Sequence, residues 1–478
     1  MLIRPGLLLC RWSSLAASLI FAFSLIAFWL VSWPVAAQTQ EPTPAEPSIQ
    51  LVQPPGPNQT VPPVTITLQD ALERSRRNDA QYLSAVADAQ IAREDRVQAK
   101  AALLPQVAST AQYLGTQGNG VLPSGRFVSN DGVHLYRAWG VLHQDLSPAT
   151  FLMTGYKRAS AAEALAKAKT AIAARGLAAT VTRNYYAVAV SQRRYSTAQQ
   201  GLQQAQRFFD ITRESERLGQ TAHSDTVKAE LQYQQQKQAL DEAILAMESV
   251  RLSLAVLLSP TLNLNFNILD DLDSPRALPA FAEAKQMAEQ ENPDLGVALE
   301  RLQAANLDVT SAKLSFLPSL TIETDYGIEA NAFALHSRVA ADPDVGRLPN
   351  LGYFVTATLN FPLWDWGALR SKLHQTEYRK RQAQSQLSQA QRQIVSNLYA
   401  FYNEASVARS AVETLRHAAD LAAVILRLIN LRYQAGESTA LEVVDAQNTL
   451  TQARNAYDDA QARYRVAVAN LQTVTGAF

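Results

Sequence analysis

The chain has 478 residues, and its 43 Lys plus Arg balance 43 Asp plus Glu, so its formal net charge is zero. No basic block stands out, which argues against a nucleic-acid partner. The only cysteine is Cys10, so the composition also excludes a scaffold held together by disulfides.

The first 37 residues have the layout of a secretory signal. Basic Arg4 and Arg11 precede an apolar run at 15–31, and small Ala36 and Ala37 follow it. We therefore predict that 1–37 is a signal peptide and exclude it from the fold. An uncleaved N-terminal anchor is the alternative, although the 17-residue run is short for a membrane span.

Residues 38–63 contain eight prolines among Gln, Thr and Glu. Such a composition cannot bury a core, so we predict a disordered, extended lead-in. Beyond residue 37 no stretch approaches about 18 uninterrupted apolar residues, and no further transmembrane helix is predicted.

Two windows of more than 100 residues contain no proline, after Pro148 and after Pro362. They are rich in Ala, Gln, Leu, Glu and Arg, a composition that predicts long helices. Landmarks around them recur. Pro105 and Pro318 each close a helical pattern and lie 213 positions apart, whereas the glycines Gly219 and Gly436 lie 217 apart. The sequence thus indicates two tandem repeats.

The hydrophobic register after the two glycines supports the duplication. Nine positions alternate steps of four and three in each copy, and each pair is 217 residues apart. They are Ala229, Tyr233, Gln236, Leu240, Ala243, Met247, Val250, Leu254 and Leu257, then Ala446, Leu450, Ala453, Tyr457, Ala460, Tyr464, Ala467, Leu471 and Val474. An average step of 3.5 residues is a coiled-coil seam.

Alternating runs at 107–113, 136–146, 320–326 and 353–361 predict two strands per copy, with loops at 118–132 and 342–350. One unit is then a helix of about 35 residues, a strand, a loop, a strand, a helix of about 60, a glycine turn and a helix of about 40. The predicted first repeat is 64–260, the linker 261–279 and the second repeat 280–478.

Strands of about ten residues with alternating polarity have the length needed to cross an outer membrane, but four strands cannot close a barrel, which needs at least about eight. Open strand edges are not tolerated in lipid, so the chain must oligomerise if it spans. We expect a mainly α fold with a small β part: four strands per chain in a shared transmembrane β-barrel, and coiled-coil helices that continue as an α-barrel. The alternative is an exported periplasmic coiled-coil scaffold without channel activity.

At this point the residues resemble a known family. The features are the Leu104-Pro105 and Leu317-Pro318 helix ends before alternating strands, Asn292-Pro293, the strand exit at 359–363, and Tyr433 to Gly436 followed by 441–447. Each is weak singly, but their order and spacing over 65–476 are similar to those of the TolC-like outer-membrane efflux protein family.

The resemblance implies a homotrimer in the outer membrane, with one 12-stranded barrel and helices that extend into the periplasm. In that family the duct is a passive conduit for small toxic molecules or secreted polypeptides in a tripartite efflux or type I secretion system. It docks to a periplasmic adaptor and an inner-membrane pump. No cofactor is implied, and the sequence names neither the cargo nor the pump.

The resemblance also implies roles for tip residues. Gly219 and Gly436 fall on periplasmic turns that meet the adaptor. Glu442 and Asp445 occupy the places of acidic side chains that line the pore constriction. Residues at i and i+3 share a helix face, so three copies would gather a negative ring that favours cations. An ordinary solvated face near a helix N-terminus is the alternative for this pair.

In the family a tyrosine, an arginine and an aspartate hold the closed state. Tyr433 and Asp225 match, but Ser438 stands at the place of the arginine. The latch is then missing or is supplied by another residue, such as Arg432 or Arg217. We predict a looser gate than is usual for the family. The copies differ here, because Asp225 corresponds to Glu442, whereas Lys228 corresponds to Asp445.

The six histidines, at 134, 143, 223, 336, 374 and 417, show no metal-ligand spacing, and no glycine-rich phosphate loop follows a strand. His223, Ser224 and Asp225 are adjacent at a helix tip and cannot reach the geometry of a hydrolase triad. We therefore predict that the chain is not an enzyme and binds no metal.

Overall fold

A computed structural model describes residues 51–52, 63–115, 134–260, 262–274, 277–330, 333–342 and 346–476. The predicted signal peptide, most of the predicted lead-in and the predicted loop at 118–132 lie outside these residues. The chain divides into two compact units, 1–52 and 53–478. The first contributes β1 (Leu51–Val52), and the account below concerns the second.

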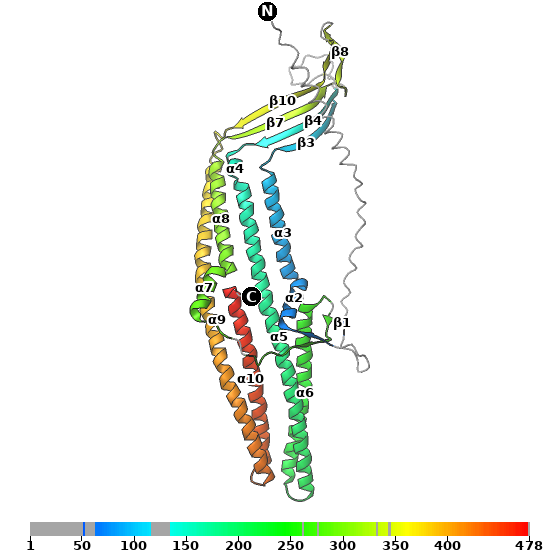
Figure 1. The fold of residues 1–478 in the computed structure, drawn as a ribbon, viewed down its shortest axis with the longest axis vertical. Coiled ribbons are helices and arrows are strands. Elements are labelled where there is room, and N and C mark those ends of the chain that lie inside the picture. Colours follow the sequence, from blue (N-terminus) through cyan, green and yellow to red (C-terminus); the bar gives the residue numbers. More distant parts are fainter. Residues whose placement is uncertain are drawn as a thin grey trace, which may run out of the picture. The chain divides into compact units, whose positions relative to one another are not determined.

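The order of the long elements is the same in both halves of the second unit (Figure 1). The first half contains β2 (Val64–Ile66), α2 (Leu68–Asn78), α3 (Ala80–Ala101), β3 (Gln106–Gly115), β4 (His134–Asp145), α4 (Pro148–Phe151), α5 (Thr154–Arg217) and α6 (His223–Leu258). The second half contains β5 (Leu262–Asn263), β6 (Phe266–Ile268), α7 (Phe281–Glu291), α8 (Pro293–Leu314), β7 (Ser319–Ala330), β8 (His336–Asp342), β9 (Gly346–Pro349), β10 (Leu351–Asn360), α9 (Ala368–Gln434) and α10 (Ala440–Thr475).

Two sequence predictions were wrong in detail. The single helix of about 35 residues expected before each first strand is two helices, because a capping side chain breaks each one. Asp79 accepts a hydrogen bond from Tyr82 N–H at 2.7 Å, and Asn292 caps α8 with Pro293 in its first turn. The predicted loop at 342–350 contains β9, which pairs with β8 as a hairpin.

The four strands that the alternation predicts are present and form one antiparallel sheet in the order β10-β7-β4-β3. The two halves meet at its centre, where β4 pairs with β7 over ten residue pairs from Tyr136↔Ala330 to Asp145↔Thr321. The outer strands of the sheet are therefore β3, from the first half, and β10, from the second.

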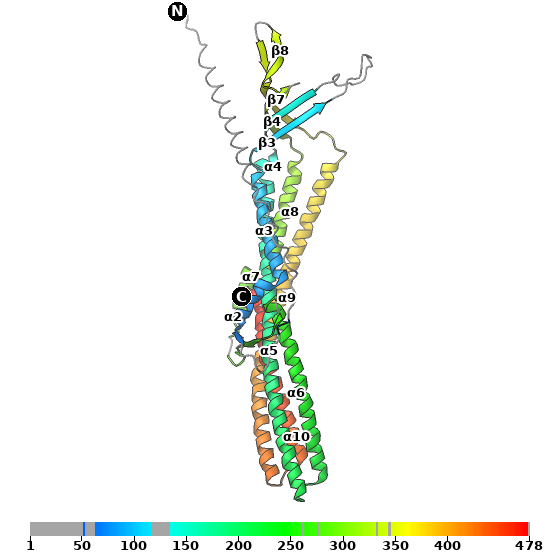
Figure 2. The ribbon, with the colours of Figure 1, turned by 90° about the vertical axis from the view of Figure 1, so that its right-hand side faces the viewer.

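The helices next to the sheet follow the same order as the strands. α3 packs on α5, α5 on α8 and α8 on α9 (Figures 1 and 2). Farther from the sheet α5 pairs with α6 and α9 with α10, and α10 also packs on α5, so two helical hairpins lie side by side. Their turns lie at the end of the unit opposite the sheet (Figure 1).

The predicted seams lie at these helix contacts. In α10 seven of the nine seam positions are buried, the exceptions being half-buried Ala453 and Tyr457. In α6 only Ala229 and Leu254 are buried, and the other seven are half-buried. α6 packs chiefly on α5, whereas α10 packs on both α9 and α5, which explains the difference.

A core at mid-length joins the two halves. Ile66 on β2 and Ile268 on β6 pair in a short parallel ladder, and both pack in a cluster with Tyr185 and Tyr186 of α5. The Oη atom of Tyr185 donates to Leu269 O at 2.6 Å. The segment that follows β6, from Leu269 onward, is thereby fixed across α5.

Arg193 holds the same segment through ion pairs. Arg193 on α5 contacts Asp270 at 2.5 Å, Asp273 at 2.7 Å and, on α10, Asp458 at 3.1 Å. One guanidinium therefore ties the linker to both hairpins, and its planar fork of five N–H donors suits such multiple contacts.

Among the helices that the structure describes, none combines a length of at least 18 residues with the apolar character of a membrane span.

Candidate functional site at the helical tips

Both hairpins turn at a glycine in the left-handed region, Gly219 (φ 73°) and Gly436 (φ 77°). A residue with a Cβ pays about 1–2 kcal/mol to adopt this conformation, which explains glycine here. One bond across each turn satisfies a carbonyl at the helix end: Gln220 N–H to Ser215 O and Glu437 N–H to Arg432 O, both 2.9 Å. The two tips are closed by the same geometry.

The start of α10 fixes Glu442. Its backbone N–H donates to Thr439 Oγ1 at 3.3 Å, and the Thr439 hydroxyl donates to Oε1 of the same carboxylate at 3.3 Å. Ser438 Oγ donates to Oε2 at 2.7 Å. The Ser438 hydrogen bond is the largest cause that lowers the pKa of Glu442 below its ordinary value. The carboxylate is thus held ionised at a set place in the tip.

Asp445 lies one turn further along α10 and is exposed, whereas Val443 and Ala446 between and beyond the acids are buried. The predicted acidic pair therefore occupies the less buried side of the helix. In the other hairpin Lys228 lies 3.8 Å from Asp225, so that acid has a cation beside it. At the corresponding positions, α10 therefore has two acids, whereas α6 has an acid and a lysine.

The predicted gate residues lie around one groove between the hairpins, with a volume of about 1020 Å³. Its lining includes Asp225 from α6 and Tyr433, Gly436 and Ser438 from the second tip. Tyr433 packs its ring on Phe208 of α5, with 5.2 Å between ring centroids at 60°. A ring contact of this kind is worth about 0.5–1.5 kcal/mol beyond the area it buries.

Neither proposed substitute for the missing arginine reaches Asp225 in the described part of the chain. Arg217 is paired with Glu214 of its own helix at 2.5 Å, and Arg432 donates to the Glu437 carbonyl at 3.3 Å. Sequence reasoning missed Arg207 of α5, which lines the groove together with Lys228. Its spacing from Gly219 offered no signal, because only the packing of the hairpins brings it there.

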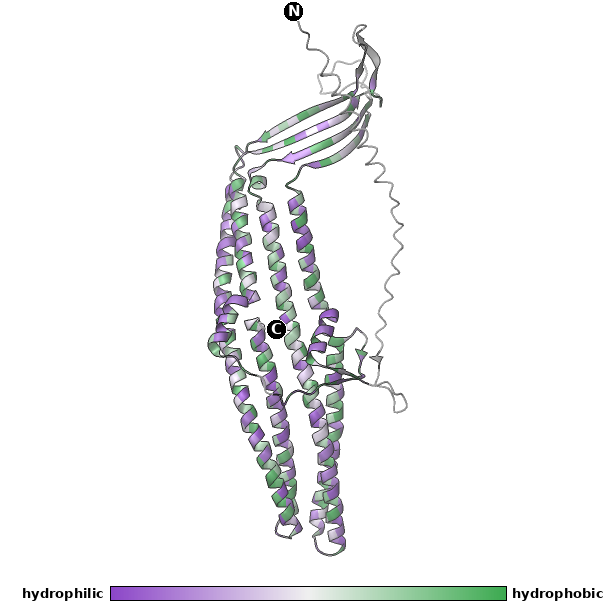
Figure 3. Cartoon of the chain, viewed as in Figure 1, coloured by the Kyte–Doolittle hydropathy of each residue, from purple (hydrophilic) through white to green (hydrophobic). Residues whose placement is uncertain are grey.

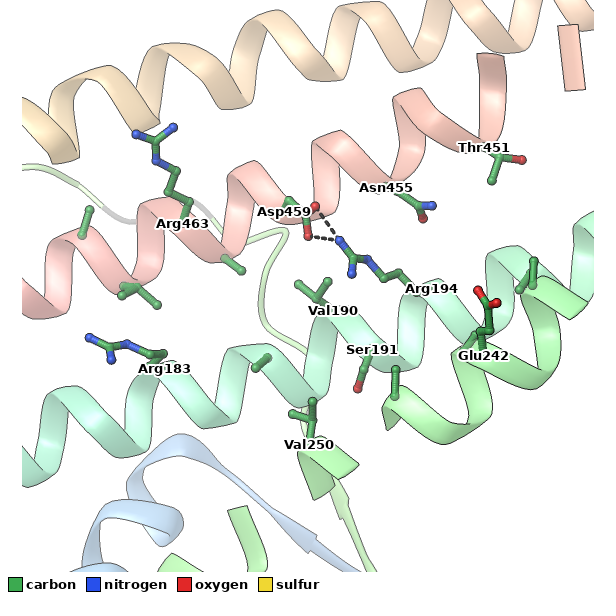
Figure 4. A pocket seen from close by; sticks show the side chains of 18 of the residues that line it. Arg183, Val190, Ser191, Arg194, Glu242, Val250, Thr451, Asn455, Asp459 and Arg463 are labelled. Atoms are coloured by element: carbon green, nitrogen blue, oxygen red, sulfur yellow. Dashed lines mark hydrogen bonds and ion pairs between the residues drawn. The ribbon is translucent and has the colours of Figure 1, made fainter. Parts of the chain in front are cut away.

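A second cavity, of about 690 Å³, lies between α5, α6 and α10 nearer mid-length (Figure 4). Alanine and valine side chains form much of its lining, and its charges are largely paired. Arg194 donates to both oxygens of Asp459 at 2.7 and 2.6 Å, and Arg463 pairs with Glu404 at 2.7 Å. Ser191 donates to the Val188 carbonyl within its own helix. This arrangement fits a gap between hairpins and offers no activated nucleophile.

The sheet has one apolar and one polar face, as its alternating colours indicate (Figure 3). The apolar face carries Val107, Tyr113, Leu142, Ile322, Tyr326, Tyr353, Val355 and Leu359, and Val107 and Tyr353 are 79% and 77% exposed. The other face carries Gln106, Gln112, Arg137, Glu323, Asp325, Glu329, Thr356 and Thr358. An exposed apolar face of this size marks a surface that contacts another protein or a membrane.

Within the polar face Arg137 pairs with Glu329 at 2.8 Å. Next to that pair the rings of Trp139 and Phe354 meet edge to face, 5.5 Å apart, across β7. Gly327 leaves room for this crossing, since a Cβ there would lie 2.8 Å from Trp139 Cδ1.

No group of three or more His, Cys, Asp or Glu side chains that could hold a metal is found among the residues the structure describes.

Comparison with known proteins points to one family. The model of the outer membrane efflux protein family matches residues 284–477. TolC of Vibrio cholerae is 25% identical over 86% of this chain and 91% of its own length. In fold, a membrane protein of Pseudomonas aeruginosa is similar with a TM-score of 0.72 at 17% identity, covering 90% of this chain and 97% of that one. The outer membrane protein VceC of Vibrio cholerae has a TM-score of 0.71 at 17% identity, covering 86% and 96%.

By sequence and by fold, the chain is similar to members of the outer membrane efflux protein family.

The relatives support a location in the outer membrane, and the matched family consists of efflux channels rather than enzymes. The resemblance read from the sequence and the mainly helical fold with few strands are confirmed. The matched region of the family model, 284–477, includes Tyr433, Gly436, Glu442 and Asp445, whereas Gly219 and Asp225 lie before it. The roles assigned to all six residues stay predictions.

Proposed function

We propose that three copies of this chain form a passive exit duct across the outer membrane, which docks through its helical tips to a periplasmic adaptor and an inner-membrane pump. The duct carries small toxic molecules or secreted polypeptides outward, and the pump supplies the energy. The observation that carries the proposal is the four-stranded sheet with two outer strands and faces of opposite polarity.

The sheet is too small to close on itself, because a barrel needs at least about eight strands. Its outer strands, β3 and β10, would leave main-chain groups unpaired in lipid, which is not tolerated there. Head-to-tail pairing of β10 with β3 of the next copy removes both edges. Three copies of a four-stranded sheet supply twelve strands, with the apolar faces toward lipid and the polar faces toward a lumen.

The helices support the same closure. Because α3, α5, α8 and α9 follow the order of the strands, pairing β10 with the next β3 also brings α9 beside the next α3. The half-buried seam of α6 likewise gains a partner in a ring. A duct wall of helices then continues the barrel away from the membrane.

The tips supply the gate and the docking surface. Tyr433 packed on Phe208 holds the second hairpin against the first, and Glu442 with Asp445 would line the opening as six carboxylates in a trimer. With Ser438 at the place of the family's arginine, this ring contact acts together with the buried cluster of Phe208, Ala229, Ala440 and Val443 to hold the groove. The two exposed turns at Gly219 and Gly436 are presented for the adaptor.

Site-specific crosslinking tests the docking. Gln220→Cys and Glu437→Cys place a thiol at each tip, and Gln98→Cys on exposed α3 is the control; the only natural cysteine is Cys10. In cells we expect both tip variants to crosslink a periplasmic adaptor, identified by mass spectrometry, and the control not to. A soluble periplasmic product without a trimer would instead support the coiled-coil scaffold.

A further inference from the structure

The segment between β10 and α9 exposes four large apolar side chains in six residues. Phe361, Leu363, Trp364 and Trp366 are 59%, 82%, 77% and 89% exposed. They follow directly on Leu359, which lies on the apolar face of the sheet. The apolar surface of the sheet is therefore extended past its last strand to the start of the helices.

The backbone holds this segment in place. Asp365 accepts hydrogen bonds from Gly367 N–H at 3.0 Å and from Leu369 N–H at 2.6 Å. Trp366 has φ 57°, a conformation that costs a residue with a side chain about 1–2 kcal/mol. The two indoles meet edge to face with 5.6 Å between centroids. The Asp365 hydrogen bonds and the contact between the two rings thus define the conformation of this segment.

Directly after the tryptophans, α9 begins with an excess of positive charge. Residues 368–381 contain one acid, Glu377, and five basic residues: Arg370, Lys372, Arg379, Lys380 and Arg381. The ion pairs of the described part of the chain include none of the five; Arg381 lies over the Tyr378 ring at 5.7 Å. Cations at a helix N-terminus oppose the helix dipole, and the first turn of α9 has no acid. Helix stability does not account for them.

The matching junction of the first half differs in charge. Phe151, Leu152 and Met153 are also exposed there, and Met153 too has a positive φ, of 52°. The first 14 residues of α5 contain three basic residues, of which Arg158 pairs with Asp308 at 2.8 Å and Lys167 with Glu163 at 2.7 Å. Exposed apolar side chains are common to both junctions, whereas a cluster of five basic residues outside the ion pairs of the described chain occurs at the second, against Lys157 alone at the first.

We propose that residues 361–381 bind anionic phospholipids of the membrane surface on the helical side of the sheet. Indole rings are apolar at one end and polar at the other and settle at the bilayer interface. Lysine and arginine next to such an anchor attract anionic headgroups, and arginine forms paired hydrogen bonds with phosphate. The apolar part would hold any lipid, and the five cations would select phosphatidylglycerol or cardiolipin over a zwitterionic lipid.

Native mass spectrometry of the intact oligomer tests this. Phosphatidylglycerol and phosphatidylethanolamine with the same acyl chains are titrated into the wild type and three variants. The first carries R370Q, K372Q, R379Q, K380Q and R381Q. The second carries W364A and W366A. The control, R392Q with R409Q, removes two exposed arginines farther along the same helix. If the five-fold variant does not fold, R370Q with K372Q replaces it.

We expect the wild type and the control to prefer phosphatidylglycerol by about tenfold, since each cation near the surface adds to the attraction. The glutamine variant should lose this preference, and the tryptophan variant should bind both lipids more weakly while keeping the preference. No preference in the wild type, or an undiminished one in the glutamine variant, would overturn the proposal.

The five-fold glutamine variant also tests the alternative that these cations contact a neighbouring copy of the chain instead of lipid. In a ring, α9 lies beside the next copy's α3, whose Asp88, Glu94 and Asp95 are exposed. If the glutamine variant dissociates but keeps its lipid preference, the cations serve the contact between copies, and the lipid-binding proposal is contradicted. Ion conductance of the same preparations tests the proposed duct separately, because a channel without lipid preference refutes only this inference.

Discussion

Arg193 is the residue on which the linker and both hairpins converge. Of its three carboxylate partners Asp458 is the most enclosed, with 10% of its side chain exposed. Burial raises the pKa of Asp458, and the Arg193 hydrogen bond opposes that rise. The ionised acid is therefore tolerated at neutral pH because the guanidinium is present.

Replacing Arg193 by Gln should destabilise the protein by about 3 kcal/mol, because a buried charge loses its partner. The check is the apparent Tm of the purified protein. Arg194→Gln is the adjacent control, since its pair with Asp459 is about half exposed and should cost about 0–1 kcal/mol. Without Arg193 the pKa of Asp458 in the native state rises further. As the pH falls, Asp458 is then protonated in the native state before it is protonated in the unfolded state, so the loss of stability caused by Arg193→Gln should shrink. Equal Tm values for the two variants would contradict the role of Arg193.

Tyr433 is the second residue with a definite consequence. Its described contact is ring on ring with Phe208, and no hydrogen bond from its hydroxyl to Asp225 is found in the described residues. Tyr433→Ala should therefore raise single-channel conductance several-fold, whereas Tyr433→Phe should leave it nearly unchanged. If Tyr433→Phe raises the conductance as much as Tyr433→Ala does, the hydroxyl group, and not the ring contact, keeps the channel closed.

Ser438 sets the acidity of Glu442. Its hydroxyl lowers the pKa of that carboxyl, so Glu442 stays charged at a lower pH than an ordinary glutamate. Ser438→Ala removes the hydrogen bond and moves the pKa up toward its usual value. Cation selectivity, followed by reversal potential as the pH is lowered, should then be lost at a higher pH than in the wild type. A titration that does not move, or that moves down, would show that Glu442 does not set selectivity.

At the scale of elements, the sequence predicts most of what local patterns determine. The seam positions of α10 and the four strands follow from periodicity, and the two tips follow from Gly219 and Gly436. The helix breaks at Asp79 and Asn292 were missed because the apolar pattern continues across a single capping residue. The contacts of Arg193 and the crossing of Trp139 over Gly327 join residues far apart in the chain. No spacing rule reveals contacts of that kind.

Gly327 offers a test at this scale. A Cβ there would lie 2.0 Å from Ala138 O and 2.8 Å from Trp139 Cα on the paired strand. Gly327→Ala should therefore push β4 and β7 apart at the joint between the two halves. We expect a large loss of assembled protein in outer-membrane fractions on unheated gels. Gly352→Ala is the control, since a Cβ there meets no described atom within 4 Å; equal assembly of both variants would contradict the close packing.

At the scale of the whole molecule, one polypeptide holds a sheet of four strands with two open edges and a helix, α6, whose seam is mostly half-buried. The order of strands is repeated in the order of helices, so in the proposed trimer a single head-to-tail contact would complete both layers. The two halves share this plan but differ at the ends of their helices. Two acids mark the tip of α10, and positive charge without ion pairs marks the start of α9. These asymmetries are where we expect the halves to divide gating and membrane anchoring.

The most direct measurement is single-channel recording in planar bilayers with protein extracted from outer membranes. The account predicts stepwise conductance that belongs to the detergent-stable trimer and favours cations. It also predicts that the Glu442→Gln, Asp445→Asn double variant conducts with little of that preference. A protein that inserts but gives no steps, or a double variant as cation-selective as the wild type, would contradict the account.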